Sequence, residues 1–328
     1  MGRILRVRDR VLGRDVAMKV LAQFNVSEPS ALEDELTVRF LREARITGRL
    51  EHPSITPVHE LGRREDGTVY YTMKLVRGQT LAEAIHSCTS LRERLALLPH
   101  IVDVSNAIAY AHSLGIIHRD IKPDNILIGD FGETVLLDWG IAKVRDDHEA
   151  WAEDPAGLDF LVQTDQGKTM PGFVLGTPAF MPPEQARGRN ALVDERSDVY
   201  ALSALLYVVL TGRQLFDGES GTDILMQVLR NEPKRIRSLE RRAPKELAAI
   251  CEKAMAKAPV DRIQSAREFA EELTRYLAGQ RVLTYAYSPA ERLQRIIGRY
   301  RAASATAAVA LLVVGVLLAA YTLRLRET

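Results

Sequence analysis

Polar residues that could take part in proton transfer or metal binding are concentrated between residues 118 and 143. The stretch HRDIKPDN, residues 118–125, places a carboxylate, an ammonium and an amide within six positions. The stretch NILIGDFGETVLLDWGIAK, residues 125–143, then contains two Asp-aromatic-Gly triplets, at 130–132 and at 138–140. Carboxylate and amide oxygens are the kind of ligand that Mg²⁺ prefers. Only one of the two triplets can supply the aspartate of a metal site for phosphoryl transfer.

Length and composition indicate a folded protein with one large domain or two ordinary ones. The chain has 328 residues, of which 46% are hydrophobic and 27% charged, and its net charge is +1, as in globular proteins. This charge balance, without any basic-aromatic stretch, gives no reason to expect nucleic-acid binding. Cys88 and Cys251 are far apart, which argues against a disulfide framework and for a reducing compartment.

The first part of the chain is rich in predicted strands. Residues 3–8 and 15–21 read as two strands joined by a turn, and residues 68–76 are a β-rich run after an Asp-Gly turn. A helix is expected to begin near Ser30, where the Ser-x-x-Glu pattern is a capping box.

The second part is rich in predicted helices. From residue 81 onward the pattern is mostly helical, with an interruption from 116 to 185. Residues 198–212 are nearly all apolar and therefore predict a buried central helix. Strands followed by helices predict an α+β protein of two lobes, with a hinge near residues 74–78.

The stretch HRDIKPDN resembles the catalytic loop of the protein kinase superfamily, and the resemblance covers about residues 1–275. It implies a two-lobed protein kinase fold that uses ATP and Mg²⁺. In that family the residue matching Asp120 accepts the proton of the substrate hydroxyl. The residue matching Lys122 neutralises charge on the γ-phosphate, and the one matching Asn125 holds a magnesium ion.

A predicted hairpin decides between the two triplets. Two short apolar runs, 126–128 and 134–137, flank a turn, so the residue before Asp138 should lie opposite Asn125. Asp138 then lies beside Asn125, as two ligands of one metal must. Asp130 falls at the far tip, roughly 10 Å away at about 3.3 Å per residue, where Asp and Gly favour a turn. The second triplet, with Trp as its aromatic residue, is therefore the predicted metal-binding one.

The sequence VAMK, residues 16–19, resembles the strand that carries the phosphate-pairing lysine of protein kinases, here Lys19. Leu36, Phe40 and Glu43 recur at i, i+4 and i+7, which places Glu43 on the inward face of the following helix. A charge on that face is costly unless it is paired. We therefore expect an ion pair between Lys19 and Glu43.

The resemblance also implies where a nucleotide would lie. The implied N-lobe is residues 1–76 and the implied C-lobe residues 77–278. Met73 would precede the hinge, and backbone groups of Lys74 and Val76 would bond to adenine. The residues implied to pack on the faces of the adenine ring are Ile4, Ala17 and Leu127.

The sequence GTPAFMPPEQARG, residues 176–188, resembles the end of a kinase activation segment. Thr177 together with Lys122 is the combination found in Ser/Thr-specific members. The resemblance implies a structural pair, Glu184 with Arg262, and a brace for the catalytic loop, Asp198. The whole pattern is similar to that of the bacterial, eukaryotic-like transmembrane Ser/Thr kinases.

The segment before that motif is predicted to be regulatory. Arg119 directly precedes the implied catalytic aspartate, an arrangement that in related kinases pairs with a phosphorylated activation segment. Glu184 lies 46 positions after Asp138, and the intervening segment is long and acidic, so we expect it to be mobile until ordered. Thr169 and Thr164 are its available hydroxyls. Thr169 is favoured because it has fewer acidic neighbours, and an ordinary loop threonine is the alternative.

The chain departs from the kinase pattern at its start. Of the phosphate-covering Gly-x-Gly-x-x-Gly loop only the last glycine, Gly2, is present. We expect the DNA upstream to encode, in frame, an apolar strand and a Gly-x-Gly sequence that join Met1. The alternative is a clipped nucleotide lobe, which favours a pseudokinase.

Residues 302–323 predict a single transmembrane helix. They carry no charge over 22 positions, and as a helix would extend about 33 Å against a hydrocarbon core of about 30 Å. A buried core helix is the alternative. The basic segment 279–301 precedes them and a short tail, 324–328, follows, so the positive-inside tendency places residues 1–301 in the cytoplasm. This predicts a single-pass protein of the bacterial inner membrane.

These patterns favour a membrane-tethered Ser/Thr protein kinase whose substrates are proteins with Ser or Thr, with possible self-association for autophosphorylation. A membrane-anchored pseudokinase, which binds partners without catalysis, is the first alternative. A small-molecule phosphotransferase is the second, and it would share the Asp…Asn…Asp core but would not be expected to have the 176–188 motif.

Overall fold

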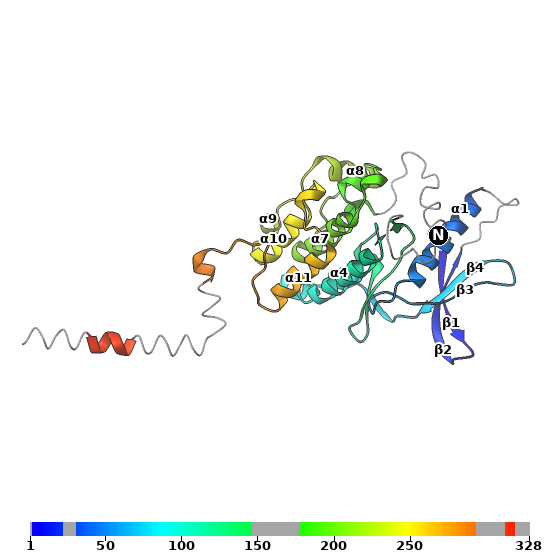
Figure 1. Ribbon diagram of the computed structural model, residues 1–328, viewed down its shortest axis with the longest axis horizontal. Coiled ribbons are helices and arrows are strands. Elements are labelled where there is room, and N and C mark those ends of the chain that lie inside the picture. Colours follow the sequence, from blue (N-terminus) through cyan, green and yellow to red (C-terminus); the bar gives the residue numbers. More distant parts are fainter. Residues whose placement is uncertain (1, 22–30, 146–176, 293–311, 319–328) are drawn as a thin grey trace, which may run out of the picture. The chain divides into compact units, whose positions relative to one another are not determined.

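The computed structural model describes the residues 2–21, 31–145, 177–292 and 312–318, without the side chains of 31–35. Contacts divide the chain into two units, Met1–Thr284 and Tyr285–Thr328. The first unit combines a β-rich part with a helical part, the N-lobe and C-lobe of the expected α+β architecture (Figure 1).

The β-rich part is a four-stranded antiparallel sheet in the order β1-β2-β4-β3, accompanied by one long helix, α1 (Ala31–Gly48). Its strands are β1 (Gly2–Asp9), β2 (Arg14–Leu21), β3 (Val58–Arg63) and β4 (Val69–Lys74). Gly13 ends the β1–β2 turn with φ +65°, a conformation that only glycine adopts at little cost. Apolar residues from the sheet and α1 pack into one core, which includes Ala17, Phe40, Tyr71 and Met73.

Two small sheets link this part to the helices. One has the order β5-β7-β8, and the other pairs β6 with β9. Their strands are β5 (Gly78–Thr80), β6 (Ile116–Ile117), β7 (Ile126–Gly129), β8 (Thr134–Leu136) and β9 (Lys143–Val144). The register of β7 and β8 is the predicted one, since Ile128 pairs with Thr134. The Leu137 N–H then donates to the Asn125 carbonyl at 2.8 Å, which continues the hairpin by one step.

The helical part is built around α7 (Glu195–Thr211), whose residues 197–211 are all buried. Asp194 caps its first turn through the Arg196 N–H, and Gly212 ends it in the left-handed conformation. The other described helices of this part are α2 (Leu81–Ser87), α3 (Leu91–Leu95), α4 (Leu98–Ser113), α6 (Pro183–Ala186), α8 (Gly221–Arg230), α9 (Ile236–Leu239), α10 (Lys245–Ala254) and α11 (Ala266–Leu277). The buried central helix expected near 198–212 is therefore confirmed.

A buried ion pair fixes the end of the predicted activation segment to the helical core. Glu184, on α6, accepts two hydrogen bonds from the Arg262 guanidinium, at 2.7 and 2.8 Å. Both residues are almost fully buried, and Ser197 adds a third bond to the carboxylate at 2.7 Å. The predicted pairing of Glu184 with Arg262 is thus present, and it joins three separate stretches of chain.

The first unit extends to Thr284, because Glu272 accepts backbone N–H bonds from Leu283 and Thr284 at 3.0 and 2.7 Å. In the second unit, residues 312–318 are helical with exposed side chains. Within the described ranges no helix has the length and apolar character to cross a membrane. Most of the predicted span 302–323 lies outside the described residues.

Glu184→Gln should lower the free energy of unfolding by about 3 kcal/mol or more, because it leaves the Arg262 charge buried without its carboxylate. Urea denaturation of the purified chain measures this loss. Glu195→Gln is the matched control, since Glu195 forms a partly exposed pair with Arg145 at 2.7 Å and should cost less than about 1 kcal/mol. Equal losses in the two variants would contradict the structural role of Glu184.

Candidate active site

The loop between β6 and β7 gathers the predicted catalytic residues. The Lys122 ammonium lies 2.8 Å from the Asp120 carboxylate and donates to the Thr177 hydroxyl at 2.9 Å. The Thr177 N–H donates to the other oxygen of Asp120 at 3.1 Å. The Asn125 amide donates to the carbonyl and carboxylate of Asp120 at 2.9 and 3.2 Å. One carboxylate is therefore held from three sides.

His118 supports this loop as a neutral imidazole. It is fully buried, its ring centroid lies 4.5 Å from that of Trp139 in a tilted arrangement, and both ring nitrogens are hydrogen-bonded. The Asp120 N–H donates to Nδ1 at 3.2 Å, so Nε2 carries the proton and faces the Leu137 carbonyl at 3.3 Å. Burial lowers the pKa of His118 below its ordinary value of 6.5, which agrees with this single-proton arrangement.

Asp198 braces the same loop from α7. Its carboxylate is fully buried and accepts the backbone N–H groups of His118 and Arg119 at 2.8 and 2.9 Å. His112 lies against it at 2.8 Å. Burial raises the pKa of Asp198, but its hydrogen bonds and the nearby histidines outweigh burial and hold the pKa below the ordinary value. The predicted bracing contact is present.

The expected pair on the β-rich side is also present. The Lys19 ammonium lies 2.5 Å from the Glu43 carboxylate, which is 3% exposed, and 3.8 Å from Asp138. The Tyr71 hydroxyl donates to the same Glu43 oxygen at 2.6 Å. Burial, followed by the Glu43 charge, raises the pKa of Tyr71, which therefore stays a hydrogen-bond donor. The carboxylate of Glu43 is shared between an ammonium and a phenol.

The two Asp-aromatic-Gly triplets occupy different environments. Trp139 is 1% exposed beneath the site, whereas Phe131 is 97% exposed at the tip of the hairpin. Asp138 lies near Lys19 and has φ +63°, a left-handed conformation that is rare outside glycine. Asp130 lies at the β7–β8 turn, away from these groups. The structure thus brings only the second triplet to the cluster.

The donor set fits a magnesium ion. The Asn125 nitrogen is used by Asp120, so the amide oxygen is left for a cation, and the Asp138 carboxylate is about half exposed. A Cβ at Gly140 would lie 3.1 Å from Asp138 and 3.2 Å from Glu43, so the glycine keeps this space open. Mg²⁺ is commonly bound by one or two protein oxygens together with phosphate and water. The described residues contain no cluster of three or more His, Cys, Asp or Glu that could hold a metal by themselves.

Most of the predicted nucleotide-contacting residues lie on strands of the β-rich sheet. Ala17 pairs with Met73 and Ile4 with Lys19 across adjacent strands. Ala17 and Met73 are buried, whereas Ile4 is 60% exposed. The remaining ones lie on or beside these strands and the β7 hairpin: Gly2 in β1, Lys74 at the end of β4, Val76 in the connection that follows and Leu127 in β7.

The predicted regulatory residues are only partly described. Arg119 has φ +69°, donates to the Ile141 carbonyl at 2.5 Å and has its own carbonyl bonded by Gln185 at 2.9 Å. Thr164 and Thr169 lie outside the described residues.

Tyr71 and the two histidines, His112 and His118, also take part in this site, although no role was predicted for them from the sequence. Tyr71 lies two positions before Met73 on the same strand, so the alternation of side chains could have placed both on one face. His112 gave no local signal, because its partner Asp198 is 86 positions away.

Comparisons with known proteins agree with this geometry. Residues 1–276 match the protein kinase domain family. The chain belongs to the protein kinase family. It is 34% identical over 297 residues to serine/threonine-protein kinase PknD of Protochlamydia amoebophila, covering 85% of this chain and 29% of that protein.

Two further kinases show similar likeness. Identity is 36% over 283 residues to serine/threonine-protein kinase PknB of Mycolicibacterium smegmatis, covering 85% of this kinase chain and 41% of the relative. The identity to serine/threonine-protein kinase pkn3 of Myxococcus xanthus is 36% over 284 residues, which cover 83% of this chain and 47% of that protein. The matched regions thus span less than half of these relatives.

The buried neutral His118 predicts a loss of stability in acid. At pH values between the pKa of His118 in the folded chain and about 6.5, the unfolded chain binds a proton at this histidine that the folded chain does not. The free energy of unfolding therefore falls as the pH falls. Urea denaturation at several pH values between about 7.5 and 5.5 measures the slope. His118→Gln should be less stable throughout and show a shallower slope. The control, His86→Gln at an exposed position on α2, should keep the original slope, and a His118→Gln slope equal to it would contradict the assignment.

Proposed function

We propose that this chain is a Ser/Thr protein kinase that transfers the γ-phosphate of ATP to Ser or Thr hydroxyls of protein substrates. The observation that carries the proposal is the bonding of Asp120 to Lys122, Asn125 and Thr177. The three reported relatives are each named as a serine/threonine-protein kinase. The motif around Thr177 supports a protein substrate over a small molecule.

In this mechanism Asp120 would accept the proton of the substrate hydroxyl while that oxygen forms its bond to the γ-phosphorus, and the bond from the γ-phosphorus to the oxygen of the β-phosphate breaks to release ADP. The bonds from Asn125 and Thr177 hold the carboxylate in one orientation, which is the main requirement of a positioned base. Lys122 lies 2.8 Å from the carboxylate, close enough to offset negative charge that develops on the transferred group.

The nucleotide would lie against the β-rich part. Lys19, held by Glu43, would pair with phosphate oxygens, and Asn125 and Asp138 would hold magnesium. Bound magnesium would neutralise charge on the β- and γ-phosphates. The adenine ring would contact backbone groups of the hinge and apolar side chains. The residues proposed for these contacts are Gly2, Ile4, Ala17, Met73, Lys74, Val76 and Leu127.

We also propose that the kinase is tethered to the cytoplasmic face of a bacterial inner membrane by residues 302–323. Twenty-two uncharged positions are long enough for a helical span, and the preceding basic segment 279–301 supports a cytoplasmic first unit. Tethering in the plane of a membrane raises the local concentration of the chain, which would favour self-association and autophosphorylation.

Asp138→Asn and Asp120→Asn should each reduce phosphoryl transfer about 10²–10⁴-fold, because one loses a metal ligand and the other the proton acceptor. Transfer of labelled phosphate from ATP to a protein substrate, in the presence of Mg²⁺, measures the rate.

Asp130→Asn is the matched control, because it makes the same chemical change in the other triplet, at an exposed turn. It should retain activity within about twofold. An inactive Asp130→Asn with an active Asp138→Asn would reverse the assignment of the two triplets. Full activity of Asp120→Asn would contradict its role as the proton acceptor, whereas no phosphoryl transfer by the unchanged chain would support the pseudokinase reading.

Phosphorylation of Thr169, with Thr164 as the second candidate, should increase activity by pairing with Arg119. A phosphate adds about −1.5 to −2 charges and can order a segment through arginine contacts. Mass spectrometry of the active chain should find phosphate on Thr169, and Thr169→Ala should lower activity more than Thr164→Ala. Active protein without phosphate on either threonine would refute this regulation.

A further inference from the structure

A strongly basic surface lies at the α8–α9 end of the helical part. Residues 230–242 contain six basic residues against two acidic ones, although the whole chain carries a net charge of only +1. All six basic side chains are exposed. The basic surface consists of Arg230, Lys234, Arg235, Arg237, Arg241 and Arg242.

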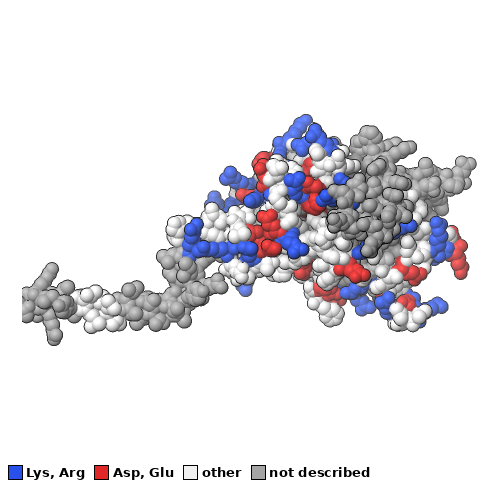
Figure 2. All heavy atoms as spheres, in the orientation of Figure 1, with Lys and Arg blue, Asp and Glu red and all other residues white. Residues whose placement is uncertain are grey.

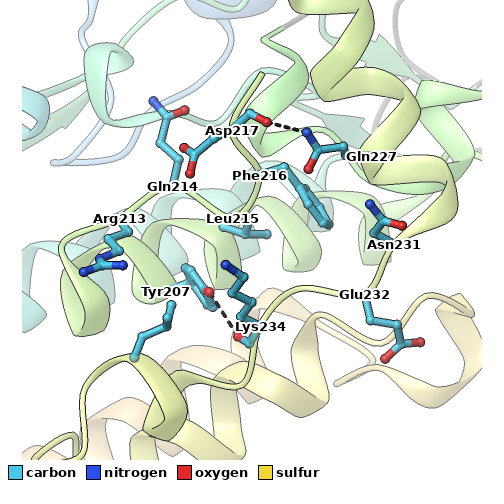
Figure 3. Close-up of a pocket in the computed structure, with 11 residues that line it drawn as sticks. Tyr207, Arg213, Gln214, Leu215, Phe216, Asp217, Gln227, Asn231, Glu232 and Lys234 are labelled. Atoms are coloured by element: carbon cyan, nitrogen blue, oxygen red, sulfur yellow. Dashed lines mark hydrogen bonds between the residues drawn. The ribbon is translucent and has the colours of Figure 1, made fainter. Parts of the chain in front are cut away.

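The acidic residues of this stretch do little to neutralise it. Glu240 is already within 3.7 Å of Arg94, a residue of α3 outside the basic surface. Glu232 points away from the adjoining cavity in Figure 3, whereas the Lys234 side chain extends between Tyr207 and Leu215. Among the described residues, none of the six basic side chains forms an ion pair with a carboxylate.

The basic surface lies far from the nucleotide-contacting sheet. Figure 1 shows α9 and α10 at the end of the helical part opposite strands β1–β4. Lys and Arg side chains are visible over this region in Figure 2. A partner bound here would leave the active-site loop uncovered, so it would position the kinase without blocking its substrates.

The length of the chain that follows limits how far this surface can be from a bilayer. Only 17 residues, 285–301, separate the first unit from the uncharged stretch 302–323. Fully extended, they reach at most about 60 Å, whereas a folded unit of this size has a radius of gyration of about 19 Å. A tethered first unit therefore stays within roughly its own diameter of the headgroups.

The exposure and spread of the basic side chains favour a partner that carries many negative charges over a single small anion. Its side chains are exposed and spread over 13 positions. One bound phosphate would require a few converging donors, but many anionic headgroups can each meet one flexible cation. Such attraction falls off within about 8 Å at physiological salt, so it requires direct contact with the membrane surface.

We propose that the basic surface docks on anionic phospholipid headgroups and orients the kinase with α9 toward the bilayer and the nucleotide-contacting sheet away from it. The proposal rests on the membrane tether proposed above. The basic surface would be a second attachment to the membrane. It would set the orientation of the first unit, whereas the tether limits only the distance of this unit from the bilayer.

The test uses the full chain reconstituted with phosphatidylcholine vesicles, with or without phosphatidylglycerol, and hydrogen exchange of the backbone amides of residues 230–242. We expect phosphatidylglycerol to slow exchange in this stretch at least about fivefold, the effect expected of even one basic side chain at an anionic surface. High salt should remove the protection.

The variant Arg235→Gln/Arg237→Gln/Arg242→Gln should lose this protection. Its matched control removes three exposed charges elsewhere in the first unit, Arg10→Gln/Arg63→Gln/Arg267→Gln, and should keep it. Both variants should retain phosphoryl transfer in detergent, which shows that they fold.

Equal exchange with and without phosphatidylglycerol would overturn the proposal and leave the basic surface to an acidic protein partner. Failure of the tether is a separate outcome, in which the chain is not retained by phosphatidylcholine vesicles. In that case sedimentation of the chain with phosphatidylglycerol vesicles still tests the basic surface. Binding to these vesicles that is lost in the triple arginine variant supports docking, and no binding by the unchanged chain overturns the proposal.

Discussion

The geometry of the active-site loop depends on one buried carboxylate, that of Asp198. It accepts the N–H groups of His118 and Arg119 and contacts His112. Arg119 is held at φ +69°, an unfavourable conformation for a residue with a side chain. The two N–H bonds offset this cost and turn the chain so that Asp120 faces Thr177. Because Asp198 lies in the first turn of the buried helix α7, the helical core fixes the position of the base.

A second shared carboxylate, Glu43, organises the β-rich side. Lys19 and Tyr71 both bond to it, and Lys19 also lies 3.8 Å from Asp138. Burial makes each of these contacts stronger than it would be in water, and makes the loss of any one costly. The phosphate-pairing lysine, the helix α1 and the metal-binding triplet are therefore coupled. Movement of α1 would change the position of the Lys19 ammonium.

Charge is distributed unevenly over this nearly neutral chain. The acidic groups that matter for chemistry are partly or fully buried around the active-site loop, whereas one end of the helical part presents six exposed basic residues. Buried charges are bonded and specify geometry, but exposed charges act through a field that many partners can share. In the proposed tethered kinase, the first group would perform the reaction and the second would orient the molecule.

Elements whose cause is local could be predicted from the sequence. The β7–β8 register followed from the two short apolar runs and the turn between them, and this register alone separates Asp138 from Asp130. Glu43 was placed inward by the helical period, and HRDIKPDN indicated the family. Only the folded structure shows that Tyr71 shares Glu43, that His112 and His118 support the loop, and that within the described residues none of the six basic side chains near α9 is paired with a carboxylate. The contacts of Tyr71 with Glu43 and of His112 with Asp198 join residues 28 and 86 positions apart, and neither such contacts nor the exposure of a side chain produces a periodic pattern in a sequence.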